Sequence, residues 1–472
     1  MSAARTLYST VMWLAQPLLR RKLRRRAVAE PGYAHAVDER FGHYAPGRPA
    51  GTDTRRTVMP APATAAMGHR GEPGAPWVWI HAVSLGETRA AAILLTALRR
   101  QWPGMRLLLT HGTATGRAEG AKLLLPGDQQ AWQPWDTPGA VQRFLRHFQP
   151  DVGILMETEV WPNLVAACRA HGVPLVLANA RFNAHSLKKA QRVAALARPA
   201  YRGLTVAWAQ TDEDADRLRA IGTPVGGVFG NLKFDVVPDA SQWAQGRAWR
   251  ANGRRPVVLL ASSREGEEAL WLDVLMQKQA LALMPQGSGA TDRGANAMSE
   301  PWAVQWLIVP RHPQRFDEVA ALLTQAGLRV SRRSQWAAEA GPVAPADVWL
   351  GDSLGEMALY YGLTDVAMLG GSFAPLGGQN LIEAAACGCP VVLGPHTFNF
   401  AQAAEAACSA GAARRVADME QGVHTAVEWA SHPAQLALGR ARAEQFAQAH
   451  RGAADRTAHA LVAVLAEAAR RG

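Results

Sequence analysis

The chain has few cysteines. Its 472 residues contain only four, Cys168, Cys387, Cys389 and Cys408, and their scattered positions match no disulfide framework. So few cysteines indicate a reducing compartment. Cys387 and Cys389 are too close together for a zinc knuckle and have no partner pair, so we interpret them as small packing residues.

Several catalytic signatures are also missing. The sequence contains no Walker A motif, no HExxH and no GxSxG, and its metal-ligating residue types do not cluster. These absences argue against a P-loop nucleotidase, a zinc protease of the HExxH type and an α/β-hydrolase. We therefore expect no metal and no cofactor.

No apolar run is long enough to span a bilayer. The run at residues 7–19 falls well short of the ~20 residues required. A basic block at residues 20–26 follows it, which is the reverse of a secretory signal, and no A-x-A cleavage site appears. This order predicts an interfacial helix with its apolar side in the acyl boundary and its arginines on anionic headgroups.

What the chain does have is positive charge, with a formal net charge of +11. Such a balance suits nucleic acid, anionic lipid or a phosphorylated substrate. Residues 1–44 are therefore predicted to associate with a membrane. A nucleic-acid-binding arm is a competing interpretation, against which Trp13 and the apolar run argue. A surface helix docked on the protein's own core is another.

The length exceeds one hydrophobic core and predicts two domains. Residues 45–76 have the composition of a flexible linker, and residues 286–300 that of a surface insertion. Alternating strand and helix patterns predict doubly wound, parallel α/β domains at 77–240 and 241–472. The expected strands are 77–83, 106–110, 152–156, 174–178, 205–210, 256–261, 306–309, 347–350, 366–369 and 391–393.

Doubly wound domains bind ligands beyond the carboxyl ends of their strands. The most informative such place follows the apolar strand 366–369, where residues 370–372 read Gly-Gly-Ser and a second glycine pair stands at 377–378. A helix then opens with Asn380 and carries Glu383 in its first turn. Helix N-termini bind phosphate, and a carboxylate accepts hydrogen bonds from a ribose diol. The pattern predicts a nucleotide-sugar site, with an ordinary βαβ crossover as the alternative.

Three charged residues of the first domain stand out. Glu87 begins the helix after the first strand, where the helix dipole favours its ionised form and where it could act as a general base. A helix-capping glutamate would explain its position equally well. Glu157 and Glu159 directly follow strand 152–156, so one is expected to face the ligand and the other to cap a helix. Lys233 could steady a leaving phosphate, or be a solvated lysine beside Asp235.

In the second domain, three polar segments follow strands. Arg311 follows Pro310 and is a suitable fork for phosphate or carboxylate. The segment 351–356 could hold a nucleobase by its backbone, and the segment 262–267 follows the domain's first strand. Each could equally be a polar strand-to-helix loop.

Taken together and in order, these motifs resemble the Kdo transferases of Gram-negative bacteria. That family moves 3-deoxy-D-manno-octulosonic acid (Kdo) from CMP-Kdo to the lipid A precursor. The resemblance covers most of the chain and rests on residues 39–42 (ERFG), 81–87 (HAVSLGE), 156–163 (METEVWPN), 177–181 (LANAR), 230–235 (GNLKFD), 309–313 (VPRHP), 351–356 (GDSLGE), 370–373 (GGSF), 380–383 (NLIE) and 394–400 (GPHTFNF).

The resemblance implies a GT-B fold, in which two Rossmann-like domains enclose a cleft. Residues 77–240 would form the acceptor domain and residues 241–472 the CMP-Kdo donor domain. The implied partners are CMP-Kdo, a lipid A precursor (lipid IVA) and an anionic membrane surface, with no nucleic acid. The implied location is the cytoplasmic face of the inner membrane, in a peripheral or monotopic attachment.

The resemblance also implies residue roles. Glu87 matches the proton acceptor, and Glu157 and Lys233 match residues that support the transition state. The chain departs from the family at Arg264 and Gln379, which flank the implied donor site and where the family often has histidine. The residues matching the CMP site are Pro310, Arg311, Leu354, Gly355, Glu356, Gly371, Ser372, Asn380, Leu381, Ile382 and Glu383.

Two other classes of function remain open at this point. One is a different GT-B enzyme acting on another nucleotide sugar, such as a second kind of transferase or an epimerase. The other is a non-catalytic, membrane-associated protein that binds a nucleotide sugar.

Overall fold

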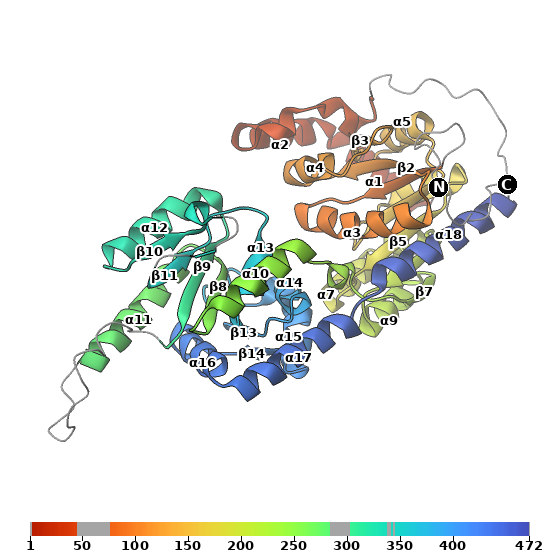
Figure 1. The fold of residues 1–472 in the computed structure, drawn as a ribbon. Coiled ribbons are helices and arrows are strands. Elements are labelled where there is room, and N and C mark those ends of the chain that lie inside the picture. The colour runs from red at the N-terminus through yellow and green to blue at the C-terminus, as the bar shows by residue number, and fades with distance from the viewer. Residues whose placement is uncertain (1, 45–75, 284–302, 338–340, 343–344, 472) are drawn as a thin grey trace, which may run out of the picture. The chain divides into compact units, whose positions relative to one another are not determined.

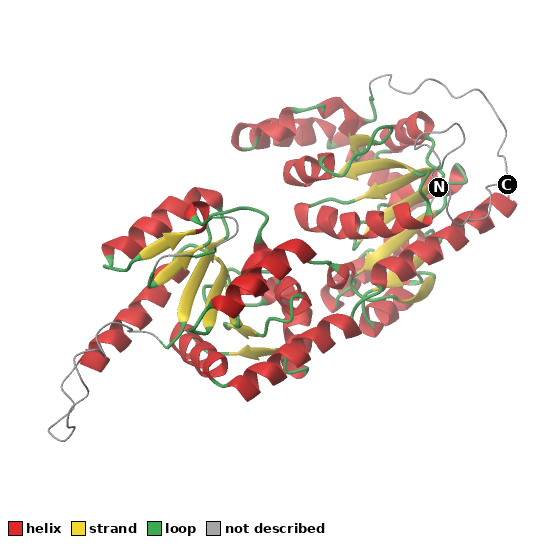
Figure 2. Ribbon diagram, in the orientation of Figure 1, coloured by secondary structure: helices red, strands yellow, loops and turns green. Residues whose placement is uncertain are grey.

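A computed structural model describes residues 2–44, 76–283, 303–337, 341–342 and 345–471 (Figure 1). The predicted linker, apart from Pro76, and the predicted insertion at 286–300 lie outside these residues. The chain divides into two compact units, Met1–Asp235 with Arg451–Gly472, and Val236–His450. Each unit is a parallel sheet with helices packed on it (Figure 2), which confirms the predicted fold class.

The sheet of the first unit has seven strands, all of whose pairings are parallel, in the order β3-β2-β1-β4-β5-β6-β7. Polar side chains that follow β1 and β4 therefore emerge beside each other, because these strands are neighbours. The strands are β1 (Trp77–His81), β2 (Arg106–His111), β3 (Gln129–Trp132), β4 (Val152–Met156), β5 (Leu175–Ala180), β6 (Val206–Ala209) and β7 (Val225–Val228).

Helices cover both faces of this sheet, and alternate strand residues enter two separate cores. Trp79 of β1 joins one core with Phe144, whereas Ile80 joins the other with Leu94. Leu461, from the end of the chain, belongs to the same core as Leu94. The helices are α3 (Leu85–Gln101), α4 (Ala114–Ala121), α5 (Pro138–Phe148), α6 (Pro162–Ala170), α7 (Ala184–Arg192), α8 (Ala194–Arg202), α9 (Asp212–Ile221) and α18 (Ala453–Arg471).

The N-terminal segment is part of the first unit. Its elements are α1 (Ala3–Leu14), α2 (Gln16–Ala29) and the 3₁₀ turns η1 (Pro31–Ala34) and η2 (Val37–Phe41). Helix α1 contacts α6 and α8, and the Ser9 hydroxyl donates to Asn163 Oδ1 at 3.0 Å. The guanidinium of Arg40 stacks on Trp132 at 3.9 Å. One face of α1 is therefore docked on the protein itself, as one alternative predicted.

The sheet of the second unit also has seven strands and only parallel pairings, in the order β10-β11-β9-β8-β12-β13-β14. The strands are β8 (Val257–Ser263), β9 (Gln305–Pro310), β10 (Val330–Arg332), β11 (Val348–Leu350), β12 (Val366–Leu369), β13 (Val391–Leu393) and β14 (Ala413–Arg415). The helices are α10 (Ala240–Asn252), α11 (Glu267–Leu283), α12 (Phe316–Gln325), α13 (Met357–Leu363), α14 (Leu381–Ala386), α15 (Ala401–Ser409), α16 (Met419–Ser431) and α17 (Pro433–Ala449).

The division into units differs from the predicted domain ranges at two places. The first unit ends at Asp235 rather than at residue 240, and it regains the chain from Arg451 onward, which the prediction had assigned to the second domain. The reason is packing, because apolar residues of α18 share a core with α3. Within the described part of the chain, no helix is both long and apolar enough to cross a membrane.

Candidate active site

Glu87 lies in the first turn of α3, at the carboxyl edge of the first sheet. Its Oε2 accepts a hydrogen bond from the Val83 amide at 2.9 Å, and its Oε1 accepts one from the Ser84 hydroxyl at 3.0 Å. The Ser84 hydroxyl also accepts from the Glu87 amide, at 3.4 Å. This is a variant of the capping box, in which the serine hydroxyl accepts from the Glu87 amide and the glutamate accepts from the amide of Val83 rather than from that of Ser84. The capping alternative is therefore correct, and it also fixes the carboxylate in place.

The environment of Glu87 changes its acidity. The pKa of Glu87 is raised to about 7, chiefly by burial and also by the negative charges of Glu157 and Glu159, while the bonds from Val83 and Ser84 oppose the rise. The helix dipole alone had been expected to favour the ionised form, but burial outweighs it. A carboxylate with a pKa close to neutrality can accept a proton and release it again, as a general base requires.

Glu157 and Lys233 form an ion pair beside this carboxylate. Lys233 Nζ lies 3.8 Å from Glu157 Oε1, and both side chains are partly buried. Glu157 directly follows β4 and has a φ of 58°, a left-handed conformation that residues other than glycine rarely adopt. Such strain is typical of functional sites. The first unit thus brings together the three residues predicted to be catalytic.

Glu159 does not cap α6, the role that the sequence suggested for one of the two acids, because the first amides of α6 donate to Asp136 instead. The Trp161 indole donates to Glu159 Oε2 at 2.9 Å, immediately before α6. Burial raises the pKa of Glu159, the Trp161 bond lowers it and the charge of Glu157 raises it. Glu159 is therefore fixed by the Trp161 indole, whereas Glu157 forms the ion pair with Lys233.

Asn179 is a functional candidate that the sequence argument did not single out. It is buried, has a φ of 52° and accepts a hydrogen bond from the Leu232 amide through Oδ1 at 3.0 Å. Its carbonyl accepts from Gln210 Nε2 at 2.9 Å. Asn179 thereby ties the end of β5 to η3 (Leu232–Asp235), the turn that carries Lys233. A buried asparagine directly after an apolar run was the available signal.

Two histidines near Glu87 are structural. Burial lowers the pKa of His81 to about 3 and that of His111 to about 4, so both are neutral near pH 7. His111 Nδ1 lies 3.0 Å from the Ala82 carbonyl, and the Thr113 hydroxyl donates to the Val83 carbonyl at 2.9 Å. His111 and Thr113 thus support the segment that leads to Glu87, whereas His81 bonds to Thr110 of β2.

In the second unit, the residues predicted to bind CMP follow three strands. Arg311 follows β9, residues 354–356 lie between β11 and α13, and residues 371–372 follow β12. Because β11, β9, β8 and β12 are consecutive in the sheet, their carboxyl ends lie along one edge. The structure therefore places these residues at a common edge.

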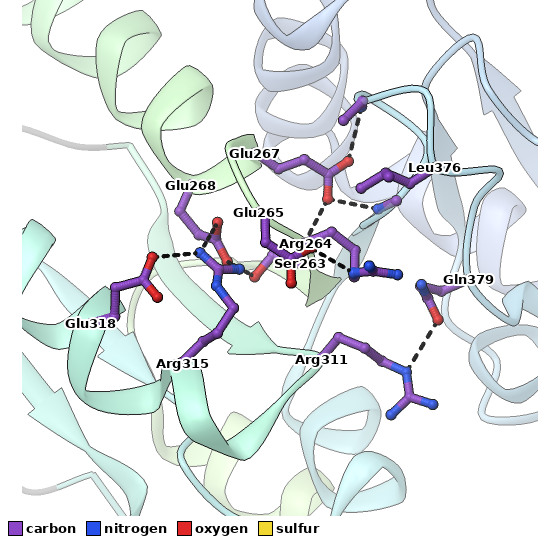
Figure 3. Close-up of polar contacts among 12 residues, drawn as sticks. Ser263, Arg264, Glu265, Glu267, Glu268, Arg311, Arg315, Glu318, Leu376 and Gln379 are labelled. Carbon is purple, nitrogen blue, oxygen red and sulfur yellow. Dashed lines mark hydrogen bonds and ion pairs between the residues drawn. The ribbon is translucent and has the colours of Figure 1, made fainter. Parts of the chain in front are cut away.

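The glycine loop after β12 is bound by a buried acid, Glu267, shown in Figure 3. Glu267 Oε2 accepts from the amides of Gly371 at 2.6 Å and Arg264 at 2.9 Å. Its Oε1 accepts from the amides of Phe373 at 3.0 Å and Ala374 at 3.2 Å. The sequence placed Gly371 and Ser372 in the CMP site, and the structure directs the amides of this loop to an internal carboxylate.

Ser372 is likewise directed inward. It is fully buried, and its hydroxyl donates to the Leu369 carbonyl and accepts from the Gly394 amide at 2.9 Å. Its side chain therefore links β12 to the segment after β13. The Ser372 hydroxyl and carbonyl are both used within the protein, so any contact of this residue with CMP would have to come from its backbone amide.

Arg264 and Gln379 approach Gly371, and Arg311 bonds to Gln379. A Cβ placed on Gly371, whose φ is 71°, would lie 3.2 Å from Gln379 Nε2 and 3.6 Å from Arg264 Cγ. Arg311 Nε donates to Gln379 Oε1 at 3.3 Å, and Arg264 Nε pairs with Glu265 at 2.9 Å (Figure 3). Arg264 and Gln379, the two departures from the family, thus lie beside Arg311 at a cationic edge suited to an anion.

The start of α14 is a local cap. Asn380 Oδ1 accepts from the Ile382 amide at 3.1 Å, and Asn380 Nδ2 donates to Glu383 Oε1 at 3.1 Å. Leu381 and Ile382 are buried, so contact with a ligand there would fall to backbone groups. Glu383 lies in the first turn, as predicted.

The segment between β11 and α13 mixes exposed and bonded residues. Leu354 is exposed, and the Gly355 carbonyl accepts from Gln242 Nε2 at 3.0 Å. Glu356 Oε1 accepts from the Arg333 guanidinium at 2.7 Å, and its Oε2 accepts from the Ser353 hydroxyl. Among the residues that the structure describes, no three His, Cys, Asp or Glu side chains gather to hold a metal.

Comparison with solved structures defines the class of fold. A UDP-GlcNAc 2-epimerase from Neisseria meningitidis is 14% identical with a TM-score of 0.50, covering 83% of this chain and 100% of that chain. A glycosyltransferase from Rickettsia africae is 11% identical with a TM-score of 0.50, covering 84% and 100%. The two parallel-sheet domains thus form the GT-B fold.

Sequence comparison then gives the family. The 3-deoxy-D-manno-octulosonic-acid transferase (kdotransferase) domain matches residues 35–236. The 3-deoxy-D-manno-octulosonic acid transferase of Bordetella pertussis is 49% identical over 389 residues, 81% of this chain and 86% of that protein. The chain belongs to this family and is a glycosyltransferase, which confirms the resemblance found in the sequence.

Proposed function

We propose that this enzyme transfers Kdo from CMP-Kdo to a lipid A precursor, lipid IVA, and releases CMP. The observation that carries the proposal is the arrangement around Glu87, in a chain of the Kdo transferase family. Burial gives this carboxylate a pKa of about 7, and the capping box holds it in place. The Glu157–Lys233 ion pair lies in the same unit.

The acceptor is a sugar hydroxyl, which is a poor nucleophile at neutral pH. In the proposed step, Glu87 takes the hydroxyl proton while the hydroxyl oxygen forms a bond to the anomeric carbon of Kdo. The bond from that carbon to the phosphate oxygen breaks, and CMP leaves with the electron pair as a phosphate monoester. Lys233 and Arg311 offset the charge that develops on it, so the step as proposed uses no cofactor.

The donor assignments follow the edge of the second sheet. Arg311 is proposed to bind the phosphate, Glu383 the ribose hydroxyls, and residues 354–356 the base. Support comes from the convergence of Arg311, Arg264 and Gln379, and from the position of Glu383 in the first turn of α14. Glu267 supports the loop beneath them rather than contacting the donor.

The enzyme is further proposed to lie on the cytoplasmic face of the inner membrane. At 100° per residue, Leu7, Val11 and Leu14 lie on the side of α1 opposite the buried Ser9. These three side chains are 67%, 54% and 62% exposed. An apolar face turned outward suits a bilayer and is unsuited to nucleic acid.

Helix α2 adds a basic surface that suits anionic headgroups. It bears a groove lined by Leu18, Arg21, Lys22, Arg25 and Arg26. This groove combines positive charge with an apolar contact, as an interfacial segment needs.

Mass spectrometry of lipid IVA after incubation with CMP-Kdo tests the proposed function. We expect a product heavier by one or more Kdo units, with CMP released in proportion. A product formed only from UDP-sugars would identify a different GT-B enzyme. Binding of CMP-Kdo without any product would identify a binding protein. The mass of the product also counts the Kdo units added.

A further inference from the structure

The first unit contains a cavity whose lining does not include Glu87, Glu157 or Lys233. Its volume is about 280 Å³, and it lies between the N-terminal end of α1 and helices α6 and α8. The lining includes Arg5 of α1 and Arg169 of α6. An apolar wall is formed by Val165, Leu196 and Pro199.

The polar side of this cavity is positive. Arg5 Nε is buried, and no hydrogen-bond acceptor for it is found in the described part of the chain. The first turns of α1 and α6 contain no acidic residue, and α1 begins at the cavity with Ser2 as its N-cap. An anion is therefore favoured by two guanidinium groups and by the dipole of α1.

One carboxylate, Asp136, interacts electrostatically with Arg5. It is 3% exposed and does not line the cavity. Its oxygens accept hydrogen bonds from the amides of Asn163 at 3.0 Å and Leu164 at 2.8 Å, and it also bonds the Tyr8 hydroxyl. Asp136 thus caps α6 and leaves Arg169 without a carboxylate partner among the described residues.

The apolar wall and the outer face of α1 indicate the source of the anion. A soluble phosphate would use the arginines but gain nothing from Val165, Leu196 and Pro199. On the opposite side of α1, Leu7 and Val11 expose apolar surface that suits a bilayer boundary. A phospholipid matches both sides of the cavity, because its phosphate suits the two arginines and its glycerol and acyl carbons suit the apolar wall.

We propose that this cavity binds the phosphate headgroup of a membrane lipid. Arg5 and Arg169 hold the phosphate, and the apolar wall covers the adjoining carbon atoms. The lipid would seat α1 between the bilayer and α6, the helix that follows the Glu157–Trp161 loop. The lining of the proposed site includes none of the predicted catalytic or CMP-binding residues, and the proposal is tested by binding alone.

Calorimetry on the full chain with monomeric dihexanoyl phosphatidic acid is the experiment. The test variant is Arg5→Gln with Arg169→Gln. The control is Arg146→Gln with Arg192→Gln, which removes the same charge from exposed positions on α5 and α7. A charge-assisted hydrogen bond accounts for about tenfold in affinity or more. We expect at least a tenfold loss in the test variant and less than a twofold change in the control.

The single variant Arg169→Gln is a second test, because it leaves Arg5 and its interaction with Asp136 unchanged. Loss of this one guanidinium should still weaken binding about tenfold. Equal affinity of the test and control variants would overturn the proposal. Inorganic phosphate that binds the wild type as tightly as the lipid would reassign the cavity to soluble anions. Dihexanoylglycerol that binds equally well would show an apolar groove without phosphate recognition.

Discussion

At the scale of single residues, Glu87 combines two functions in one carboxyl group. Its bonds to the Val83 amide and the Ser84 hydroxyl begin α3, and the same bonds fix both oxygens at the sheet edge. Burial works against ionisation and raises its pKa to about 7. Capping alone would be served best by an ordinary, fully ionised glutamate. The raised pKa is what distinguishes this residue as a base.

Replacing Glu87 by Gln should lower kcat by ~10²–10⁴-fold, because the amide cannot accept the proton. CMP affinity should stay unchanged, since the donor residues lie in the other unit. In the wild type, the base works only when ionised, so kcat/KM should fall as the pH drops below about 7. The rate should level off above that value. A variant that keeps more than about a third of the wild-type turnover would exclude Glu87 as the base.

Glu267 is the second residue whose chemistry determines a site. A fully buried carboxylate is tolerated because four backbone amides donate to it. Glu267→Gln removes the charge and directs an NH₂ group at some of these amides. Leaving a buried donor unpaired costs ~1–3 kcal/mol.

Hydrogen exchange provides the measurement for Glu267→Gln. The amides of Gly371, Phe373 and Ala374 should exchange at least tenfold faster than in the wild type, and CMP affinity should fall with them. Glu265→Gln is the matched control, because Glu265 is an exposed neighbour that pairs only with Arg264 among the described residues. Unchanged protection of these amides in Glu267→Gln would contradict the assigned role.

Sequence reasoning found Glu87 but not the role of Glu267, and the reason is distance along the chain. The capping box of Glu87 spans three residues, so local pattern reveals it. Glu267 bonds to Gly371 across 104 residues, and Asn179 bonds to Leu232 across 53. Nothing in a local window indicates such partners. The glycine loop was recognised, but the carboxylate that occupies its amides was not.

At the scale of elements, the ten central strands were predicted and the four edge strands were not. A central strand of a parallel sheet is covered on both faces, so it reads as a continuous apolar run such as residues 366–369. The missed strands β3, β7, β10 and β14 stand at the ends of the two sheets. They are short or polar, as in Val-Gly-Gly-Val for β7 and Ala-Arg-Arg for β14. The edges lack the pattern because they lack that burial.

The link between η3 and α18 is the other feature that local pattern did not reveal. Asp235, two residues after Lys233, accepts hydrogen bonds from the amides of Gly452 and Ala454. It therefore caps a helix that begins more than 200 residues later in the chain. Helix α18 packs in turn on α3, which carries Glu87. Helix α3, which carries Glu87, and turn η3, which carries Lys233, therefore both pack against α18.

Asp235→Ala should cost ~1–2 kcal/mol of stability, the usual contribution of an N-cap. It should also lower kcat several-fold by loosening η3, with little change in CMP affinity. Asp235→Asn should recover most of the activity, because asparagine caps helices nearly as well. The control is Asp455→Asn, which removes an exposed pair with Arg100 and should change little. Wild-type kcat in Asp235→Ala would show that the cap does not position Lys233.

At the scale of the whole molecule, the first unit contains both the N-terminal helices and the last helix, α18. The N-terminal helices are packed on it through the Ser9–Asn163 bond and through Leu23, which lies in a small core with Tyr33 and Phe41. Deleting residues 1–26 would disrupt this packing together with any membrane contact. Exposed side chains therefore provide the cleaner test of attachment.

Two variants separate the apolar and the electrostatic parts of the proposed membrane contact. Leu7, Val11 and Leu14 replaced by Gln should weaken liposome binding at every salt concentration, because burial of apolar surface is independent of ions. Gln in place of the basic side chains of the α2 groove should instead remove the part that fades with salt. Each basic residue near an anionic surface contributes ~1 kcal/mol, so replacing the four basic residues Arg21, Lys22, Arg25 and Arg26 should lower the partition coefficient about a thousandfold at low salt.

Flotation with anionic liposomes at low and high salt measures both effects. The control for the apolar variant is Val193→Gln, because Val193 is an exposed valine between α7 and α8. Turnover on detergent-dispersed acceptor should change much less than turnover on bilayer-embedded acceptor, because Glu87 and its capping box lie within the folded unit. If both variants float as well as the wild type, α1 and α2 are not the main anchor. Attachment would then fall to the remaining basic surface of the first unit, with Arg5 and Arg169 the first residues to test.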